Sequence, residues 1–131
     1  MRTSADIRMV TEFEVSTMSD ELPNQLAEVS RAVTGRIQSL EPEFVVVRRA
    51  DMPPRASNAD GPRVRLLMTG AVVAASRLLI DRTRLRTGRE CGSAYGKDKA
   101  TVDEAAGHLV SNRRLVEAAA AALSGLVADR A

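Results

Sequence analysis

Apolar and polar residues alternate along residues 7–16, the first patterned stretch of the chain. One face of this stretch would carry Ile7, Met9, Thr11, Phe13 and Val15. A period of two residues is that of a β-strand with one face buried. The pattern therefore predicts a half-buried strand from Ile7 to Ser16.

The spacing changes to steps of three and four residues after Ser19-Asp20, a pair typical of a helix start. The apolar positions of this stretch are Leu22, Leu26, Val29, Val33, Ile37 and Leu40. They share one helix face, so an amphipathic helix is predicted up to Leu40, where Glu41-Pro42 stops it. The next run, Phe44–Val47, has no polar alternation. It predicts a strand covered on both faces, central in its sheet and parallel to its neighbour.

The second half of the chain alternates loops with helices. Residues 49–62 are rich in proline and glycine and predict the longest loop. A broad apolar face from Arg63 to Leu79 predicts a helix, in which Gly70 suggests the close approach of another backbone. We further expect a short strand at 79–85, a flexible glycine-rich turn at 87–97, and helices at about 101–110 and 112–127.

This order of elements predicts an α/β fold with helices on the faces of an open sheet. A chain of 131 residues is long enough for one core, so we expect a single domain over residues 1–131. No segment approaches the roughly 20 apolar residues of a membrane span, and residues 1–10 lack the apolar stretch of a secretory signal. With Cys91 as its single cysteine, the chain cannot form an internal disulfide. A cytoplasmic location is expected.

The net charge of +2 conceals a strong local asymmetry. Residues 48–99 carry ten Arg and two Lys against five acids, whereas residues 1–47 carry four Arg against eight acids. A local excess of arginine attracts polyanions and suits phosphate contacts. A GC-rich coding bias would also give a ratio of 17 Arg to two Lys, so charge alone leaves nucleic-acid binding open.

The candidate phosphate ligands lie where the sheet and the turns predict a binding edge. They are Arg48, Arg49, Arg63, Arg65, Lys97 and Lys99. Ligands of open α/β sheets gather beside the carboxyl ends of strands, which favours the first two. Those two arginines could equally be solvated or paired with Asp51. The two lysines precede a predicted helix start, where an anion is favoured, but no nucleotide-binding Walker motif is present.

The stretch from Arg36 to Val110 resembles the RuvC-type Holliday-junction resolvases of the ribonuclease H-like superfamily. The features that carry the resemblance are the strand Phe44–Val47 followed by Arg48, Asn58 in the loop, the apolar helix Arg65–Ala75 around Gly70, and Gly96-Lys97-Asp98-Lys99-Ala100. The closing segment Leu115–Ala121, with Glu117, is also similar. The resemblance implies a ribonuclease H-like mixed sheet flanked by helices and a metal-dependent DNA-cleaving ancestry.

The chain departs from the family at the catalytic carboxylates. Arg48 stands where the family has a glutamate, Ala120 stands where it has its last aspartate, and its opening strand has no counterpart before Ile7. Two-metal cleavage needs several carboxylates around the cations. An arginine in such a place repels Mg²⁺ and can take a phosphate directly. The resemblance therefore implies a DNA-binding pseudonuclease without a resident metal.

Two other functions stay open. The chain could be an active, Mg²⁺-dependent, structure-specific endonuclease in which Glu14, Asp51, Asp103 or Glu117 binds the metal, although Asp103 and Glu117 are also ordinary acids for a first helical turn. It could instead be an oligomeric scaffold that uses its alanine-rich final helix and a sheet edge left open by the missing strand. The open edge predicts a homodimer.

Overall fold

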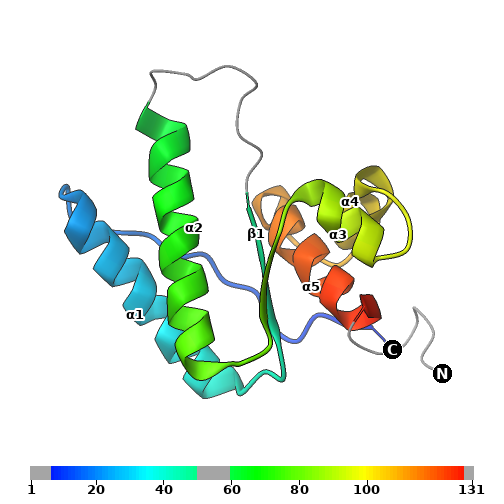
Figure 1. Cartoon of the computed structure of the whole chain (residues 1–131), viewed down its shortest axis with the longest axis horizontal. Coiled ribbons are helices and arrows are strands. Elements are labelled where there is room, and N and C mark those ends of the chain that lie inside the picture. Colours follow the sequence, from blue (N-terminus) through cyan, green and yellow to red (C-terminus); the bar gives the residue numbers. More distant parts are fainter. Residues whose placement is uncertain (1–6, 50–59, 129–131) are drawn as a thin grey trace.

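The computed structural model describes residues 7–49 and 60–128. Its elements are α1 (Leu22–Leu40), β1 (Val45–Arg48), α2 (Asp60–Leu79), β2 (Thr83–Arg86), α3 (Gly88–Ala94), α4 (Lys99–Gly107), the 3₁₀-helix η2 (Arg113–Leu115) and α5 (Val116–Ala128). Figure 1 shows α1 and α2 on one side of β1 and the shorter helices on the other. The expected α/β class is confirmed, because the described ranges contain five α-helices and one small parallel sheet.

The sheet joins β1 and β2 in parallel, with Val45 opposite Thr83 and Arg48 opposite Arg86. The predicted parallel pairing is confirmed. The predicted central position is wrong for the described ranges, where β1 has a strand neighbour on one side only. The N–H of Val45 donates to the carbonyl of Arg82, just before β2, and the N–H of Arg49 donates to the carbonyl of Arg86. Main-chain groups alternate along a strand, so those of Val46 and Arg48 face the open edge.

Helices α1 and α2 form where the apolar spacing predicts them. Pro23 stands in the first turn of α1, where a missing N–H costs nothing. The helix ends at Glu41, whose φ of 49° closes the last turn. Its apolar face contacts α2, although only Val29 and Ile37 are buried on it. None of the helices in the described ranges is long and apolar enough to cross a membrane.

The main core lies where α3, α4 and α5 meet. Its largest members are Cys91, Val102 and Leu123, and alanines of α4 and α5 fill the space between them. Small side chains let α5 lie close to β1. A Cβ on Gly125 would stand 2.4 Å from the ring of Phe44, so only glycine fits at this contact.

Residues 7–16 form no strand, contrary to the prediction. Side-chain bonds hold this segment instead of a β-ladder: Glu12 accepts from Ser111, and Glu14 accepts from Asn112. The alternation is not matched by burial, since Met9 and Val15, on the face predicted to be buried, are each 38% exposed. An alternating pattern makes a strand only where it pairs with a sheet edge, and within this molecule residues 7–16 pair with none.

Two further predictions about glycines are wrong. The expected turn at 87–97 contains the helix α3, which starts with a reciprocal cap between Thr87 and Glu90. Gly92 does not loosen this segment, because a Cβ there would stand 2.3 Å from the main chain of Asp98 and Lys99. Gly70, expected at a close backbone approach, has no such neighbour within 4 Å. Of the predicted loop 49–62, residues 50–59 lie outside the described ranges, and α2 begins at Asp60.

Candidate functional site

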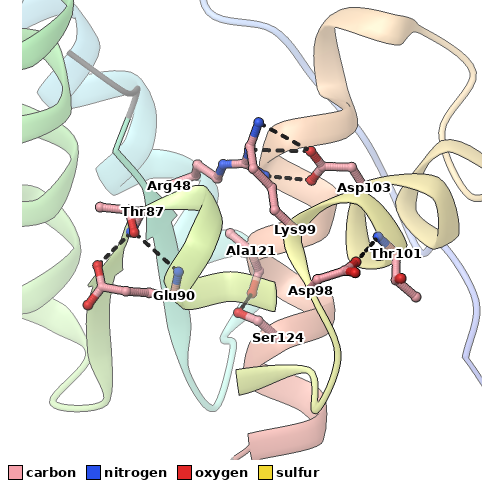
Figure 2. A network of polar contacts seen from close by, with 9 residues as sticks. All are labelled: Arg48, Thr87, Glu90, Asp98, Lys99, Thr101, Asp103, Ala121 and Ser124. Carbon is pink, nitrogen blue, oxygen red and sulfur yellow. Dashed lines mark hydrogen bonds and ion pairs between the residues drawn. The ribbon is translucent and has the colours of Figure 1, made fainter. Parts of the chain in front are cut away.

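An ion pair stands at the carboxyl end of β1. The guanidinium of Arg48 donates to both carboxylate oxygens of Asp103 on α4, at 2.7 and 3.4 Å. The Arg48 side chain is only 4% exposed, and that of Asp103 is 27% exposed. This forked geometry fixes the direction of both groups. It fastens α4 to the strand end, as Figure 2 shows.

Lys99 completes the cluster from the first turn of α4. Its Nζ lies 4.0 Å from the second oxygen of Asp103, one helical turn away. Gly88 lies beneath the two cationic side chains: a Cβ there would stand 2.5 Å from an Arg48 nitrogen and 2.6 Å from the Lys99 stem. The glycine at the start of α3 therefore makes the room in which Arg48 and Lys99 meet Asp103.

The electrostatics of the cluster keep Arg48 charged. Burial by itself lowers the pKa of the Arg48 guanidinium, but the hydrogen bond and charge of Asp103 outweigh it, and the pKa is raised. The charge of Glu117 acts in the same direction. Asp103 thus faces one buried cation and one partly exposed cation. The charge of the buried Arg48 is therefore compensated by Asp103 without any ligand.

A second polar layer lies behind the ion pair. Arg86, opposite Arg48 in the sheet, donates to the buried hydroxyl of Ser124 at 3.0 Å, and this hydroxyl donates to the Ala121 carbonyl. Cys91 lies beside them with no exposed surface. Burial raises the pKa of its thiol, despite the opposing charges of Arg48 and Arg86. The thiol is therefore a packing group, and a thiolate nucleophile is disfavoured there.

Two acids beside this end of the sheet cap helices. Glu90 accepts from the N–H of Thr87, and Asp98 accepts from the N–H of Thr101 at the start of α4. These bonds, drawn in Figure 2, lower the pKa of both carboxyl groups. Both acids are therefore ionised and hydrogen-bonded near neutral pH.

The structure brings together only part of the predicted site. Arg48, Lys99 and Asp103 meet in one cluster. Arg49 is exposed directly after Arg48, and Lys97 is exposed near the carboxyl end of α3, where its N–H donates to the Gly92 carbonyl. Arg63 and Arg65 are exposed near the start of α2. Figure 1 shows that this end of α2 and the carboxyl end of β1 point toward the same end of the molecule. Asp51 and Asn58 lie outside the described residues.

The carboxylates do not fit the divalent metal that the family resemblance implies. Both oxygens of Asp103 accept from Arg48, while Glu14 is bound to Asn112 and paired with Arg114. Within the described residues, no three His, Cys, Asp or Glu side chains stand together as a metal site would require. A cation brought to Asp103 would meet Arg48 and Lys99 at contact distance. These carboxylates are therefore poorly suited to hold Mg²⁺.

A cavity of about 580 Å³ lies along β1, and Arg48 is among the residues that line it. Its walls come from β1, from the carboxyl-terminal half of α1, from α2 and from α5, and they are mostly apolar. Phe13 lies at the wall with the guanidinium of Arg36 stacked 4.4 Å from its ring. Ser76 also lines the cavity. Its hydroxyl is buried and has no hydrogen-bond partner within the described part of the chain.

Sequence reasoning missed three of these groups. It proposed Asp51 as a partner for Arg48, but the partner is Asp103, 55 residues along the chain. The four-residue step from Lys99 to Asp103 was a usable signal, because such pairs meet on a helix. For Ser76 and Ser124 no sequence signal existed. Both are serines inside apolar helical stretches, and only the packing decides which one finds a partner.

Comparisons of the chain with family models, with curated proteins and with solved structures each gave no match. The resemblance to RuvC-type resolvases therefore stays an expectation drawn from the residues quoted for it. What the structure itself describes is a small α/β fold with a charge-compensated polar cluster at the carboxyl ends of its parallel strands and an apolar cavity along its open edge.

Proposed function

We propose that this chain binds DNA or another structured nucleic acid without cleaving it, as a degenerate relative of the RuvC-type nucleases with a ribonuclease H-like ancestry. The observation that carries the proposal is the excess of exposed cations around the carboxyl ends of the strands. These cations are Arg49, Arg63, Arg65, Arg89, Lys97 and Lys99. Glu90 and Asp98, the acids next to Arg89, Lys97 and Lys99 in sequence, are committed to helix caps.

The proposal gives Arg48 a different role from the exposed cations. Its side chain is buried and forked onto Asp103, so it holds α4 against β1 and does not reach a phosphate. Phosphate contacts fall to the exposed side chains around it, above all Arg49, Lys97 and Lys99. Each such contact releases condensed counterions from the nucleic acid, which makes binding favourable and sensitive to salt.

The absence of cleavage in this proposal follows from the same cluster. A nuclease of the two-metal type would need Asp103 free to bind a cation. Here Asp103 is bound by Arg48 and lies near Lys99. Arg49, exposed directly after the strand end, supports gripping of a backbone phosphate in place of cutting. The alternative, an active Mg²⁺-dependent endonuclease, would require this ion pair to open.

Binding to labelled four-way junction, duplex and single-stranded DNA tests the proposal. The purified protein is mixed with each probe at low and moderate salt with Mg²⁺ present, and the products are run on a denaturing gel. We expect retention that weakens as salt rises, with intact strands. Intact strands with no retention at low salt would remove the proposal, and cut strands would favour the active endonuclease.

A pair of double variants locates the surface. Arg49→Gln with Lys97→Gln removes two charges beside the cluster, and Arg31→Gln with Arg77→Gln removes two exposed charges from α1 and from the far end of α2. For duplex DNA, the first pair should lower the slope of log affinity against log salt by about 2, since each lost phosphate contact removes about 0.9. The second pair should leave the slope nearly unchanged. Equal losses in both pairs would show that binding follows net charge and not this surface.

A further inference from the structure

The open edge of β1 offers hydrogen-bonding groups that no strand of the described ranges takes up. The alternation of the ladder directs the N–H and C=O groups of Val46 and Arg48 away from β2 and toward the cavity. An unpaired strand edge of this kind is a template for one more strand. The buried hydroxyl of Ser76, without a partner in the described part of the chain, lines the same space.

The shape of the cavity restricts what can pair with this edge. Residues of α1, such as Ile37, and residues of α5, such as Ala118 and Ala122, line it on opposite sides of the strand. These helices keep the sheet of another folded molecule away from β1. A single extended segment, without helices of its own, fits between them. The occupant is therefore an extended peptide segment and not a whole sheet.

The chain itself shows which side chains suit the mouth of the cavity. Phe13 stacks against Arg36, and the Glu14 carboxylate lies 3.5 Å from the Arg114 guanidinium. An extended segment with alternating apolar and acidic residues thus matches the apolar walls and the arginines at the rim. Residues 12–15, Glu-Phe-Glu-Val, have this pattern within the stretch 7–16, which belongs to no sheet in the structure.

In its own molecule this segment does not follow β1. Its polar contacts hold it at the amino-terminal end of α5, where Glu12 and Glu14 bond to Ser111 and Asn112. Figure 1 shows it running across the direction of β1 on its way to α1. Residues 17–21 alone join it to Leu22, at the end of α1 away from β1. These polar contacts are exposed and contribute little. The segment also has Ile7 against the main core and Phe13 at the wall of the cavity, and in an exchange Phe13 would find the same wall in the second molecule.

We infer that residues 7–16 of a second copy of this chain pair as a strand with the open edge of β1, in a reciprocal exchange between two molecules. Each Phe13 then enters the partner's cavity, and the exchanged strands satisfy the outward main-chain groups of Val46 and Arg48. A reciprocal exchange closes on itself and stops at a dimer. This inference does not depend on nucleic-acid binding, because the exposed cations Arg49, Lys97 and Lys99 do not line the cavity.

Sedimentation velocity of the full chain over a wide concentration range, without nucleic acid, tests the exchange together with hydrogen exchange of the Val46 and Arg48 amides. We expect a monomer–dimer equilibrium in which these two amides become protected only as dimer forms. A monomer at every concentration would overturn the inference. Protection that is already complete in the monomer would overturn it as well, because the molecule's own segment would then occupy the edge.

Matched variants identify the segment and the edge. Phe13→Ser removes the side chain that enters the cavity and should weaken the dimer by about tenfold or more. Val10→Ser, on the opposite face of the segment and already 82% exposed, should leave the dimer unchanged. Val46→Pro removes an outward N–H while the bonds of Val45 and Arg49 to β2 remain, and should weaken the dimer by about tenfold. Equal effects of Phe13→Ser and Val10→Ser would contradict the proposed register.

A synthetic peptide of residues 7–16 keeps the test decisive if Val46→Pro does not fold. Added in excess to the full chain, it should convert dimer into a monomer–peptide complex. The same peptide with N-methyl groups on alternate residues retains the side chains but cannot complete a β-ladder, so it should fail. Competition by both peptides would show that side chains alone direct the association, and the strand pairing would be refuted.

Discussion

The two sides of β1 differ in how completely their groups are packed and paired. On the α3–α4–α5 side, α5 buries six of its residues, from Ala119 to Gly125, and the serine there is bonded twice. On the α1–α2 side, α1 buries only Val29 and Ile37 along 19 residues, and Ser76 of α2 is buried without a bond in the described ranges. Helix α2 also leaves Leu78 86% exposed.

This difference shows which side of β1 contributes most to stability and which side has surface suited to binding. The α3–α4–α5 side, built from small residues and helix caps, is a well-packed core. Adding or removing one methyl group there should therefore lower the free energy of unfolding. The α1–α2 side has exposed apolar surface, and some of its hydrogen-bonding groups have no partner in the described ranges, as is typical of an interaction surface. The following predictions test that contrast, beginning with the largest expected effect.

Gly92→Ala should destabilise the α3–α4–α5 core more than any other change proposed for it. The new Cβ would stand 2.3 Å from the main chain between Asp98 and Lys99, which cannot move without shifting α4. We expect the free energy of unfolding in urea to fall by about 3 kcal/mol or more. Gly70→Ala is the matched control on α2, where no neighbouring atom lies within 4 Å, and it should gain about 0.5–1 kcal/mol. Similar effects at both glycines would refute the contrast.

Asp103→Asn should have the next largest effect. It removes the charge that compensates Arg48 and leaves a cation of 4% exposure without its anion. Because Asp103 itself keeps some contact with solvent, we expect a loss of about 2–3 kcal/mol, at the lower end for a buried pair. Replacing both partners in Arg48→Met with Asp103→Leu should cost less than Asp103→Asn alone. A double variant that is less stable than the single one would argue against a buried charge as the cause.

The two buried serines should respond in opposite directions. Ser124→Ala leaves Arg86 without its acceptor and should lower the free energy of unfolding by about 1–2 kcal/mol. Ser76→Ala removes a hydroxyl that has no partner in the described part of the chain, and should be neutral or stabilise by up to about 1 kcal/mol. Thermal unfolding of the two variants side by side measures the difference. A loss at Ser76 as large as that at Ser124 would mean that its hydroxyl is bonded.

Acidification should produce the smallest loss of stability, and this loss should come from the α3–α4 side. The pKa values of Glu90 and Asp98 are lowered by their cap hydrogen bonds, so these groups are protonated more readily in the unfolded chain than in the folded one. Their contribution to stability is therefore complete above their ordinary pKa values, near 4, and is lost as pH falls through the lower folded values. The N-cap residue of α1, Glu21, makes no cap bond through its side chain.

Hydrogen exchange between pH 6 and pH 3, corrected for intrinsic rates, distinguishes the two sides. The first turns of α3 and α4 should lose protection, while the first turn of α1 should change less. Asp98→Asn keeps a capping oxygen that does not titrate, so α4 should then lose part of its pH dependence. An unchanged pH dependence in this variant would assign the effect to other carboxyl groups.

Local patterns predicted the long elements of this chain well and its short elements poorly. Helices α1 and α2 were predicted from apolar spacing, because each repeats one face over many turns. Helix α3 was missed because three glycines in eleven residues favour a turn, while the cap between Thr87 and Glu90 is a weaker local signal. The strand predicted at 7–16 failed for the opposite reason, since its local pattern was strong but no sheet edge paired with it.

The candidate site divides in the same way. The sequence alone placed Arg48 at a strand end, Asp103 on a helix with Lys99 just before its predicted start, and an excess of positive charge between residues 48 and 99, because each of these depends on neighbours along the chain. Only the tertiary structure decided that Arg48 binds Asp103 and that Arg86 binds Ser124. It also decided that the Ser76 hydroxyl has no hydrogen-bond partner within the described residues. Strand register and helix packing make those contacts across tens of residues, and no local pattern encodes them.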